Sequence, residues 1–249
     1  MLAKITIDNN EYKVDFSKPI DLSIPVVDGV LNPVAWYLDP PKIQPVKEGS
    51  WVAAVSQGAV INFNTLVYNP HAHGTHTECV GHITEKVHSI NQHLKTFMFA
   101  AEVITLVPES YQDDLVFTRK QAQKALGSKR PEALVIRTLP NTLSKKSRKW
   151  SHTNWPYLLE ETTVFFRECG VKHLLIDLPS VDREKDDGVL ASHNAFWDTQ
   201  GKMRMDATIT EMIYVPHTVK DGSYLLNLQI ASFENDASPS KPVLYAFED

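Results

Sequence analysis

Histidine side chains gather around one carboxylate in a short segment of this 249-residue sequence. The segment runs His71-Ala-His-Gly-Thr-His-Thr-Glu-Cys-Val-Gly-His82, and five of the chain's ten histidines fall within 18 residues. These five are His71, His73, His76, His82 and His88. A lone histidine is usually a hydrogen-bonded core residue, but packing does not explain so dense a cluster with a carboxylate inside it. Catalytic zinc sites combine imidazole and carboxylate ligands, so the segment predicts a metal site.

The spacing around Gly74 allows several of these groups to meet at one point. In an extended chain alternate side chains share a face, so His76 and Glu78 project together. Gly74 permits a backbone bend just before them, and this bend can bring either His71 or His73 to the same point. Two imidazoles and one carboxylate suit Zn²⁺ or Mn²⁺ and leave positions open for water, which is typical of a catalytic site.

Two further residues of the segment have a chemical and a structural interpretation. His82 lies four residues beyond Glu78, where an imidazole that titrates near neutrality would act on the water as a general acid or base. Cys79 could serve as a thiolate nucleophile, but it is out of phase with Glu78, so we expect a packing residue that faces away. The sequence contains no G-x-S-x-G elbow, no P-loop and no G-x-G-x-x-G motif, which disfavours other nucleophile and nucleotide chemistries.

A second set of ionisable residues lies in the C-terminal half of the chain. Asp177 ends an apolar run and Asp182 follows in a polar loop, and ligands of α/β proteins commonly bind at such carboxyl ends of strands. Most charges of that loop are expected to be solvated, and His193 alone would be unremarkable. Glu211 lies within the apolar run 208–215, where a carboxylate is costly to bury unless it is paired or bound to a metal.

The first third of the chain predicts strands and extended segments. Alternating residues around the turn Asp8-Asn9-Asn10 predict a hairpin over residues 4–16. Proline-rich residues 19–45 are expected to lie extended over the surface or beside a site. Residues 51–68 are rich in Val, Ile and Phe and predict two strands with Gln57-Gly58 at the turn.

The remainder alternates between helices and strands. A capping box at Thr118 predicts a short helix that ends at Gly127. Helical spacing then covers residues 156–169, with Pro156 in the first turn and Gly170 as the cap, between two buried strands, 133–137 and 173–177. This order predicts a parallel, right-handed crossover. The last long strand is expected over 224–233. The sum is one α/β domain with many strands and a few helices on one side of the sheet.

The histidine segment resembles the signature H-x-G-T-H-x-D-x-P-x-H of the cyclase family of metal-dependent hydrolases, which includes bacterial kynurenine formamidase and isatin hydrolase. Gly74-Thr75-His76 matches G-T-H, Glu78 stands at the Asp position and His82 at the final His. The resemblance continues in order from about residue 20 to 230, covering most of the chain. The further matching segments are Asp21-Leu22-Ser23 (D-L/I-S), residues 36–40 (W-P-G-D-P), Ser180-Val181-Asp182 (S-x-D), His193 (A-x-H) and Ile209-Thr210-Glu211 (I-x-E-N-L).

This resemblance implies a swivelling β/β/α fold, a single domain over residues 1–249 with a mixed sheet, assembled as a homodimer or higher homo-oligomer. It implies one or two divalent ions, Zn²⁺ or Mn²⁺, and hydrolysis of a small amide (an aryl formamide or a cyclic amide). His82 would be the acid/base residue and Trp36 would contact the substrate. The metal ligands that the resemblance implies are His71, His76, Glu78, His193 and Glu211.

Departures from the signature place the chain in a divergent branch. In register, the first histidine of the signature falls on Ala72, so a one-residue insertion is needed. We expect His71 to be the ligand, because it keeps an x-Gly-Thr-His run after a bulge, with His73 as the alternative. In addition to Glu78, which replaces Asp, Val80-Gly81 replaces the Pro step and Met212-Ile213 replaces Asn-Leu. The alternative functions are a lactone or ester hydrolase of the same mechanism, and a degenerate member that binds a small ligand or metal without turnover.

Net charge, cysteine content and hydropathy restrict the classes of binding partner and the location of the protein. The formal net charge is −5, and nucleic acid or an anionic membrane would instead select clustered Lys and Arg. Cys79 and Cys169 lie 90 positions apart, which does not indicate a disulfide scaffold. No apolar run approaches the roughly 18 residues of a membrane span, and no signal peptide is recognisable. We therefore expect a cytoplasmic protein that acts on a small molecule.

Overall fold

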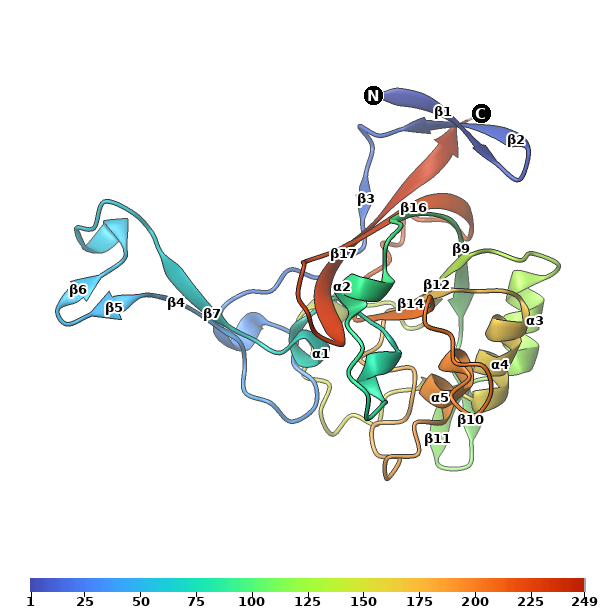
Figure 1. Ribbon diagram of the computed structural model, residues 1–249. Helices are drawn as coiled ribbons and strands as arrows, with labels where there is room; N and C mark the ends of the chain where they lie inside the picture. Colours follow the sequence, from blue (N-terminus) through green and yellow to red (C-terminus); the bar gives the residue numbers. More distant parts are fainter. Residues whose placement is uncertain (249) are drawn as a thin grey trace.

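Seven strands close into a barrel within residues 1–248, the part of the chain that the computed structural model describes (Figure 1). Their order around the barrel is β17-β16-β9-β12-β14-β15-β8, and β8 pairs back onto β17. Their bounds in chain order are β8 (His76–Glu78), β9 (Met98–Leu106), β12 (Ala133–Thr138), β14 (His173–Ile176), β15 (Thr208–Glu211), β16 (Gly222–Ile230) and β17 (Ala237–Glu248). The sheet is mixed, as expected.

Four neighbouring strands, β9, β12, β14 and β15, run parallel to one another. Both of their faces are buried, which explains why their sequences are continuous apolar runs rather than alternating ones. In β12, Val135 belongs to the core inside the barrel, whereas Leu134 and Ile136 pack toward the helices. The strands predicted at 133–137 and 173–177 are confirmed, and so is their parallel pairing.

Three helices lie together on one side of the barrel (Figure 1), as predicted: α3 (Arg119–Leu126), α4 (Glu160–Glu168) and α5 (Ala191–Trp197). The capping box at Thr118 is present, with Gly127 at the helix end. The prediction that the second helix begins at Pro156 is wrong. Tyr157–Leu158 instead forms strand β13, which pairs in parallel with β11 (Asp114–Phe117), so α4 begins only at Glu160.

The two ends of the chain meet beside the barrel. The predicted hairpin is confirmed as β1 (Leu2–Ile7) and β2 (Asn10–Asp15), with left-handed residues at its turn. Strand β17, which pairs with both β2 and β8, was not predicted. Its prolines at 239 and 242 hide the strand pattern, because proline lacks the N–H group that a central ladder uses. The last strand expected at 224–233 corresponds to β16 and ends earlier, at Ile230.

Residues 42–67 form an arm that projects from the body (Figure 1). Strand β4 (Lys42–Pro45) pairs with β7 (Asn64–Val67), and β5 (Lys47–Glu48) pairs with β6 (Trp51–Val52). The two strands predicted within residues 51–68 are present as β6 and β7 with a turn at Gly58 between them, but they do not pair with each other. Residues 55–57 form a 3-10 turn that ends at Gly58 in the left-handed conformation, and each strand of the region pairs with an earlier segment.

The remaining short elements connect these parts. They are β3 (Ile20–Asp21), α1 (Pro70–His73), α2 (Ile90–His93) and β10 (Glu109–Tyr111), with 3-10 turns at Gly29–Leu31, Val80–His82 and Leu143–Lys146. Residues 19–45 hold no α-helix, in keeping with their prolines. Across residues 1–248, none of the helices combines the length and apolarity that a bilayer crossing requires.

Candidate metal centre

Strand β8 places two of the predicted ligands on the face of the barrel wall that carries the helices, the face that Ile209 also occupies. His76 and Glu78 are fully buried and alternate with Thr77, whose hydroxyl instead contacts Thr210. Because β8 pairs with β15, His76 lies opposite Glu211 in the ladder. His76 Nε2 and Glu211 Oε2 are 3.5 Å apart. The alternation expected for this stretch therefore directs an imidazole and two carboxylates to one point.

Helix α1, just before Gly74, separates the roles of the two flanking histidines. His71 Nδ1 lies 3.1 Å from Glu78 Oε2. His73 uses both ring nitrogens on backbone groups, because Nδ1 accepts from the Asn69 N–H (2.8 Å) and Nε2 donates to the Asp39 carbonyl (2.9 Å). The geometry thus brings His71 into the cluster and leaves His73 outside it, which favours His71 as the ligand.

Helix α5 brings in the imidazole from the C-terminal half. His193 Nε2 lies 3.2 Å from Glu78 Oε1 and 3.8 Å from Glu211 Oε1. Its Nδ1 lies 2.6 Å from Asp182 Oδ2, and Asp182 also accepts the backbone N–H groups of Ser192 and His193. Asp182 therefore fixes the ring with Nε2 aimed at the cluster, which is how carboxylates commonly orient ligand histidines.

His82 completes the cluster from the turn beyond β8. Its ring stacks on that of His71, with centroids 4.2 Å apart, and its Nε2 is 3.8 Å from Glu78 Oε2. The His82 side chain is 31% exposed, whereas the Glu78 side chain is fully buried. His82 therefore stands where the buried cluster meets solvent.

Asp236 was missed by the sequence reasoning. Its Oδ2 lies 2.9 Å from His71 Nε2 and 3.2 Å from His82 Nδ1. It immediately precedes β17, whose pairing with β8 closes the barrel. An aspartate in a polar loop 154 positions after His82 carries no local signal, and only the unpredicted strand β17 would have revealed it.

Burial and charge act in opposite directions on these groups. Burial alone would lower the pKa of His71, but Asp236 and Glu78 outweigh it and raise the pKa to about 10. Burial likewise opposes a charged His193, whose pKa Asp182 and Glu78 nevertheless hold well above its usual range. The pKa of the Glu78 carboxyl is well below its ordinary value despite burial, because His82, His193 and His71 surround it. The cluster is therefore a carboxylate-rich pocket that attracts positive charge.

The donor set fits a divalent cation. Within residues 1–248, His76 Nε2 and Glu78 Oε2 are buried without a hydrogen-bond partner, and such orphaned atoms are costly unless something binds them. Ligand atoms of His71, His76 and Glu78 all lie within 4.8 Å of one another, as do those of Glu78, His82 and His193. Mixed imidazole and carboxylate donors suit Zn²⁺ or Mn²⁺.

A cavity of about 300 Å³ opens onto this cluster. Trp36 and Leu38 form part of its apolar wall, and the Trp36 ring packs edge-on against Trp155 at 5.1 Å. Trp36 and Tyr37 both adopt left-handed backbone conformations, with φ of 58° and 60°, a strain that tends to concentrate at functional sites. The other lining residues are Asn69, His71, His82, Ser180, Leu190, His193 and Glu211.

Three residues that the sequence marked as candidates lie outside the cluster. Cys79 is buried with its thiol toward the His88 carbonyl, and burial raises the pKa of the thiol to about 11, so it is no thiolate nucleophile. Asp177 forms a buried ion pair with Lys145. His88 contacts the ring of His93 instead of the cluster.

Comparisons with known proteins concern the family and the fold of the chain. The family model described as "Putative cyclase" matches residues 20–183. A predicted metal-dependent hydrolase from Bacillus stearothermophilus has a similar structure, with TM-score 0.65 and 16% identity over 92% of this chain and 98% of that chain. Isatin hydrolase A from Labrenzia aggregata, solved with benzyl benzoate, gives TM-score 0.68 and 13% identity over 93% and 94%. A potential metal-dependent hydrolase with cyclase activity gives 0.67 and 15% over 93% and 99%. At these identities the likeness shows a shared fold. A search among curated proteins gives no match.

Proposed function

The chain belongs to the cyclase family, and from that premise we propose that it is a metal-dependent hydrolase of a small amide, either an aryl formamide or a cyclic amide. The observation that supports this most is the juxtaposition of the orphaned His76 Nε2 and Glu78 Oε2 with the cavity lined by Trp36 and His82. Buried ligand atoms that make no hydrogen bond, beside a solvent-accessible cavity, describe a catalytic centre better than a structural one.

Five residues would hold one or two divalent ions, Zn²⁺ or Mn²⁺: His71, His76, Glu78, His193 and Glu211. A bound ion would supply Lewis acidity, which lowers the pKa of water and polarises a carbonyl. Asp182 fixes the His193 ring, and the Val181 N–H fixes Glu211 Oε1 (2.9 Å). The chain thus pre-orients its ligand atoms before any ion arrives.

His82 would move the proton in this reaction. It lines the cavity and is partly exposed, so it reaches both the attacking water and a leaving nitrogen. It would take a proton from the water as the carbonyl is attacked and return it to the amine as the C–N bond breaks. Trp36 would hold an aromatic part of the substrate against the cavity wall. A volume of about 300 Å³ is at the small end of ligand pockets, which favours a compact substrate.

The direct test is metal analysis of the purified protein together with hydrolysis assays on an aryl formamide, on isatin and on a simple aryl ester. Bound Zn²⁺ or Mn²⁺ with turnover of either amide, lost on chelation and restored by the ion, would support the proposal. Turnover of the ester alone would assign the lactone or ester alternative. Metal binding without any turnover would indicate the degenerate, ligand-binding alternative.

A matched pair of variants tests the first ligand. His71→Ala should lose bound metal, because it removes a ligand atom close to Glu78. His73→Ala should keep the metal and lose stability, because it removes two partly buried hydrogen bonds to backbone groups. The opposite pattern would show that the insertion in the signature falls on the other side of Ala72.

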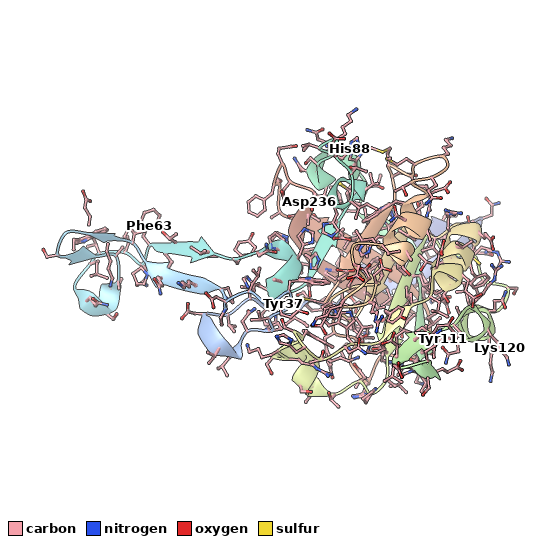
Figure 2. All side chains as sticks on the ribbon, turned by 90° about the horizontal axis from the view of Figure 1, so that it is seen from below. Tyr37, Phe63, His88, Tyr111, Lys120 and Asp236 are labelled. Atoms are coloured by element: carbon pink, nitrogen blue, oxygen red, sulfur yellow. The ribbon has the colours of Figure 1, made fainter. Side chains whose placement is uncertain are left out.

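We further propose a homodimer that the arm helps to hold together. All four residues of β7 are exposed, and Val60, Ile61 and Phe63 are 96%, 55% and 56% exposed; Figure 2 shows Phe63 far out on the arm. An isolated two-stranded ribbon is marginally stable in water, so a second copy of the chain would cover these side chains. Light scattering should give a dimer that Ile61→Asp with Phe63→Asp converts to monomer. The cytoplasmic location stays a prediction.

A further inference from the structure

We propose that Asp236 is a positioning residue that sets the ring orientation of both His71 and His82, and so links the metal ligand to the proton-transfer residue. The inference rests on the proposed function and adds to it a carboxylate that belongs to no segment of the family signature.

Asp236 lies within hydrogen-bond distance of both imidazoles. A single oxygen, Oδ2, lies 2.9 Å from His71 Nε2 and 3.2 Å from His82 Nδ1. Because the two rings are nearly parallel, with 26° between their planes, one acceptor can receive an N–H from each. The opposite nitrogens, His71 Nδ1 and His82 Nε2, then both face Glu78 Oε2, at 3.1 and 3.8 Å.

These hydrogen bonds also set the tautomers of the two rings. A neutral imidazole carries its proton on one nitrogen only, and a hydrogen bond from that nitrogen decides which lone pair remains free. An acceptor at Asp236 keeps the protons on His71 Nε2 and His82 Nδ1. When a divalent ion takes the place of the second proton on His71, that ring would present its Nδ1 lone pair to the ion, and His82 presents a lone pair at Nε2 to the cavity. Without the acceptor, each ring would be free to turn or to exchange tautomers.

The backbone holds Asp236 in place. Its carbonyl accepts the Cys79 N–H (3.0 Å), and the neighbouring Asn235 carbonyl accepts the Ile90 N–H (2.8 Å). The next residue, Ala237, pairs with Glu78 in the ladder. The side chain is 26% exposed and lies on the body of the molecule (Figure 2), so the carboxylate is fixed relative to β8 without being sealed in the core.

The same loop offers a matched control. Glu234 lies two positions earlier and bonds the side-chain amides of Asn91 and Gln92. Asp236→Ala and Glu234→Ala each remove one carboxylate from this loop, so they have the same effect on net charge. Only the first removes the acceptor of the two imidazoles.

The experiment compares Zn²⁺ affinity, kcat and the ring ¹⁵N signals of His71 and His82 in wild type and the variants. Asp236→Ala should weaken Zn²⁺ binding and lower kcat by about 10–100-fold each, with KM little changed. Asp236→Asn should lose less, because its amide oxygen still accepts a hydrogen bond. In a His82→Ala background, Asp236→Ala should still weaken Zn²⁺ binding but should lower kcat little further. The ring signals should shift in Asp236→Ala and stay in place in Glu234→Ala.

The outcomes separate this inference from the proposed function. If wild type binds Zn²⁺ and hydrolyses amide but Asp236→Ala matches it in affinity, rate and ring signals, the positioning role is wrong. A loss of Zn²⁺ beyond about 10³-fold would make Asp236 a ligand instead and also overturn the inference, since it exceeds what orienting partners cost. If wild type binds no Zn²⁺, the proposed function fails, whereas the ring signals still decide whether Asp236 orients the two imidazoles.

Discussion

Two groups of buried ionisable side chains lie at the carboxyl ends of neighbouring parallel strands, and they differ in how completely they are satisfied. Next to β14, Asp177 accepts the N–H and hydroxyl of Thr138 and pairs with Lys145 at 2.8 Å. The Lys145 ammonium also donates to the Thr138 carbonyl. Next to β15, the metal-centre cluster keeps two buried atoms that make no hydrogen bond, His76 Nε2 and Glu78 Oε2, although charged groups lie within 4 Å of each.

The contrast distinguishes a structural charge pair from a binding site. In the first group, burial disfavours both charges: it raises the pKa of Asp177 and lowers that of Lys145. In the first group each polar atom has a partner within the chain, so nothing further is required of it. The second group becomes complete only when something from outside binds, since an unpaired buried polar atom costs about 1–3 kcal/mol. Asp177 and Glu211 are both candidate site residues in the sequence, and only their contacts in the structure show that one belongs to a charge pair and the other to the cluster.

The largest expected effect comes from removing one charge at the incomplete cluster. Glu211→Gln should lose its metal and nearly all turnover, because a neutral amide is a poor ligand for a divalent cation. The fold should persist, because the Gln oxygen can still accept the Val181 N–H. Mass spectrometry measures the metal content, and circular dichroism measures whether the fold persists. Wild-type metal content would mean that this carboxylate is as structural as Asp177.

Removing His82 should separate catalysis from binding within the same cluster. His82→Ala should keep its metal and lose about 10²–10⁴-fold in rate, because the proton-transfer group is gone. Turnover of the accepted amide and bound metal are measured on one sample. A metal-free variant would make His82 a ligand, and a fully active one would assign the proton transfer elsewhere, with Glu78 the first group to examine.

The satisfied pair should respond in the opposite way. Asp177→Ala leaves the Lys145 ammonium buried and unpaired, so the free energy of unfolding should fall by about 3–5 kcal/mol. The folded fraction should bind metal as wild type does. Urea unfolding measures the loss, and adding Lys145→Met should recover part of it by removing the stranded charge. Metal loss in the folded Asp177→Ala protein would contradict the separation of the two groups.

A third buried group, His173 in β14, should give the smallest effect and one that depends on pH. Its Nδ1 lies 2.9 Å from the Thr208 hydroxyl, and burial lowers its pKa from 6.5 to about 4. Folding therefore favours the neutral ring. Its contribution is fully present above pH 6.5 and is lost as pH falls from 6.5 toward 4, because only the unfolded chain takes up the proton.

Between pH 7 and pH 5 this loss is about 2 kcal/mol. The variant His173→Gln keeps a neutral polar side chain, so its unfolding free energy should fall less than that of wild type over the same interval. Urea titrations at both pH values provide the comparison. An identical fall in the two proteins would show that His173 is not the group responsible.

Local sequence patterns predicted much of the barrel and, with the family resemblance, most of the site. The capped helix at Thr118 and the buried parallel strands are set by neighbouring residues. The second helix began late because the pairing of β13 with β11 competed successfully with a helical pattern. Strand β17 was missed because Pro239 and Pro242 hide its strand pattern, and the arm was misread because β7 pairs with β4 and not with β6. Asp236 was missed together with β17, since it reaches His71 and His82 only through the closure of the barrel.

That closure also has a consequence for how the protein is made. Strand β8 pairs only with β15 and β17 among the described residues, so His76 and Glu78 lack ladder partners until the chain beyond Thr208 and Ala237 has left the ribosome. At about 5–20 residues per second, this leaves the histidine segment waiting on the order of ten seconds during translation. An ion that arrives early meets only local, mobile groups. A tightly held ion would therefore mark a chain that has been translated at least as far as the strand that closes the barrel.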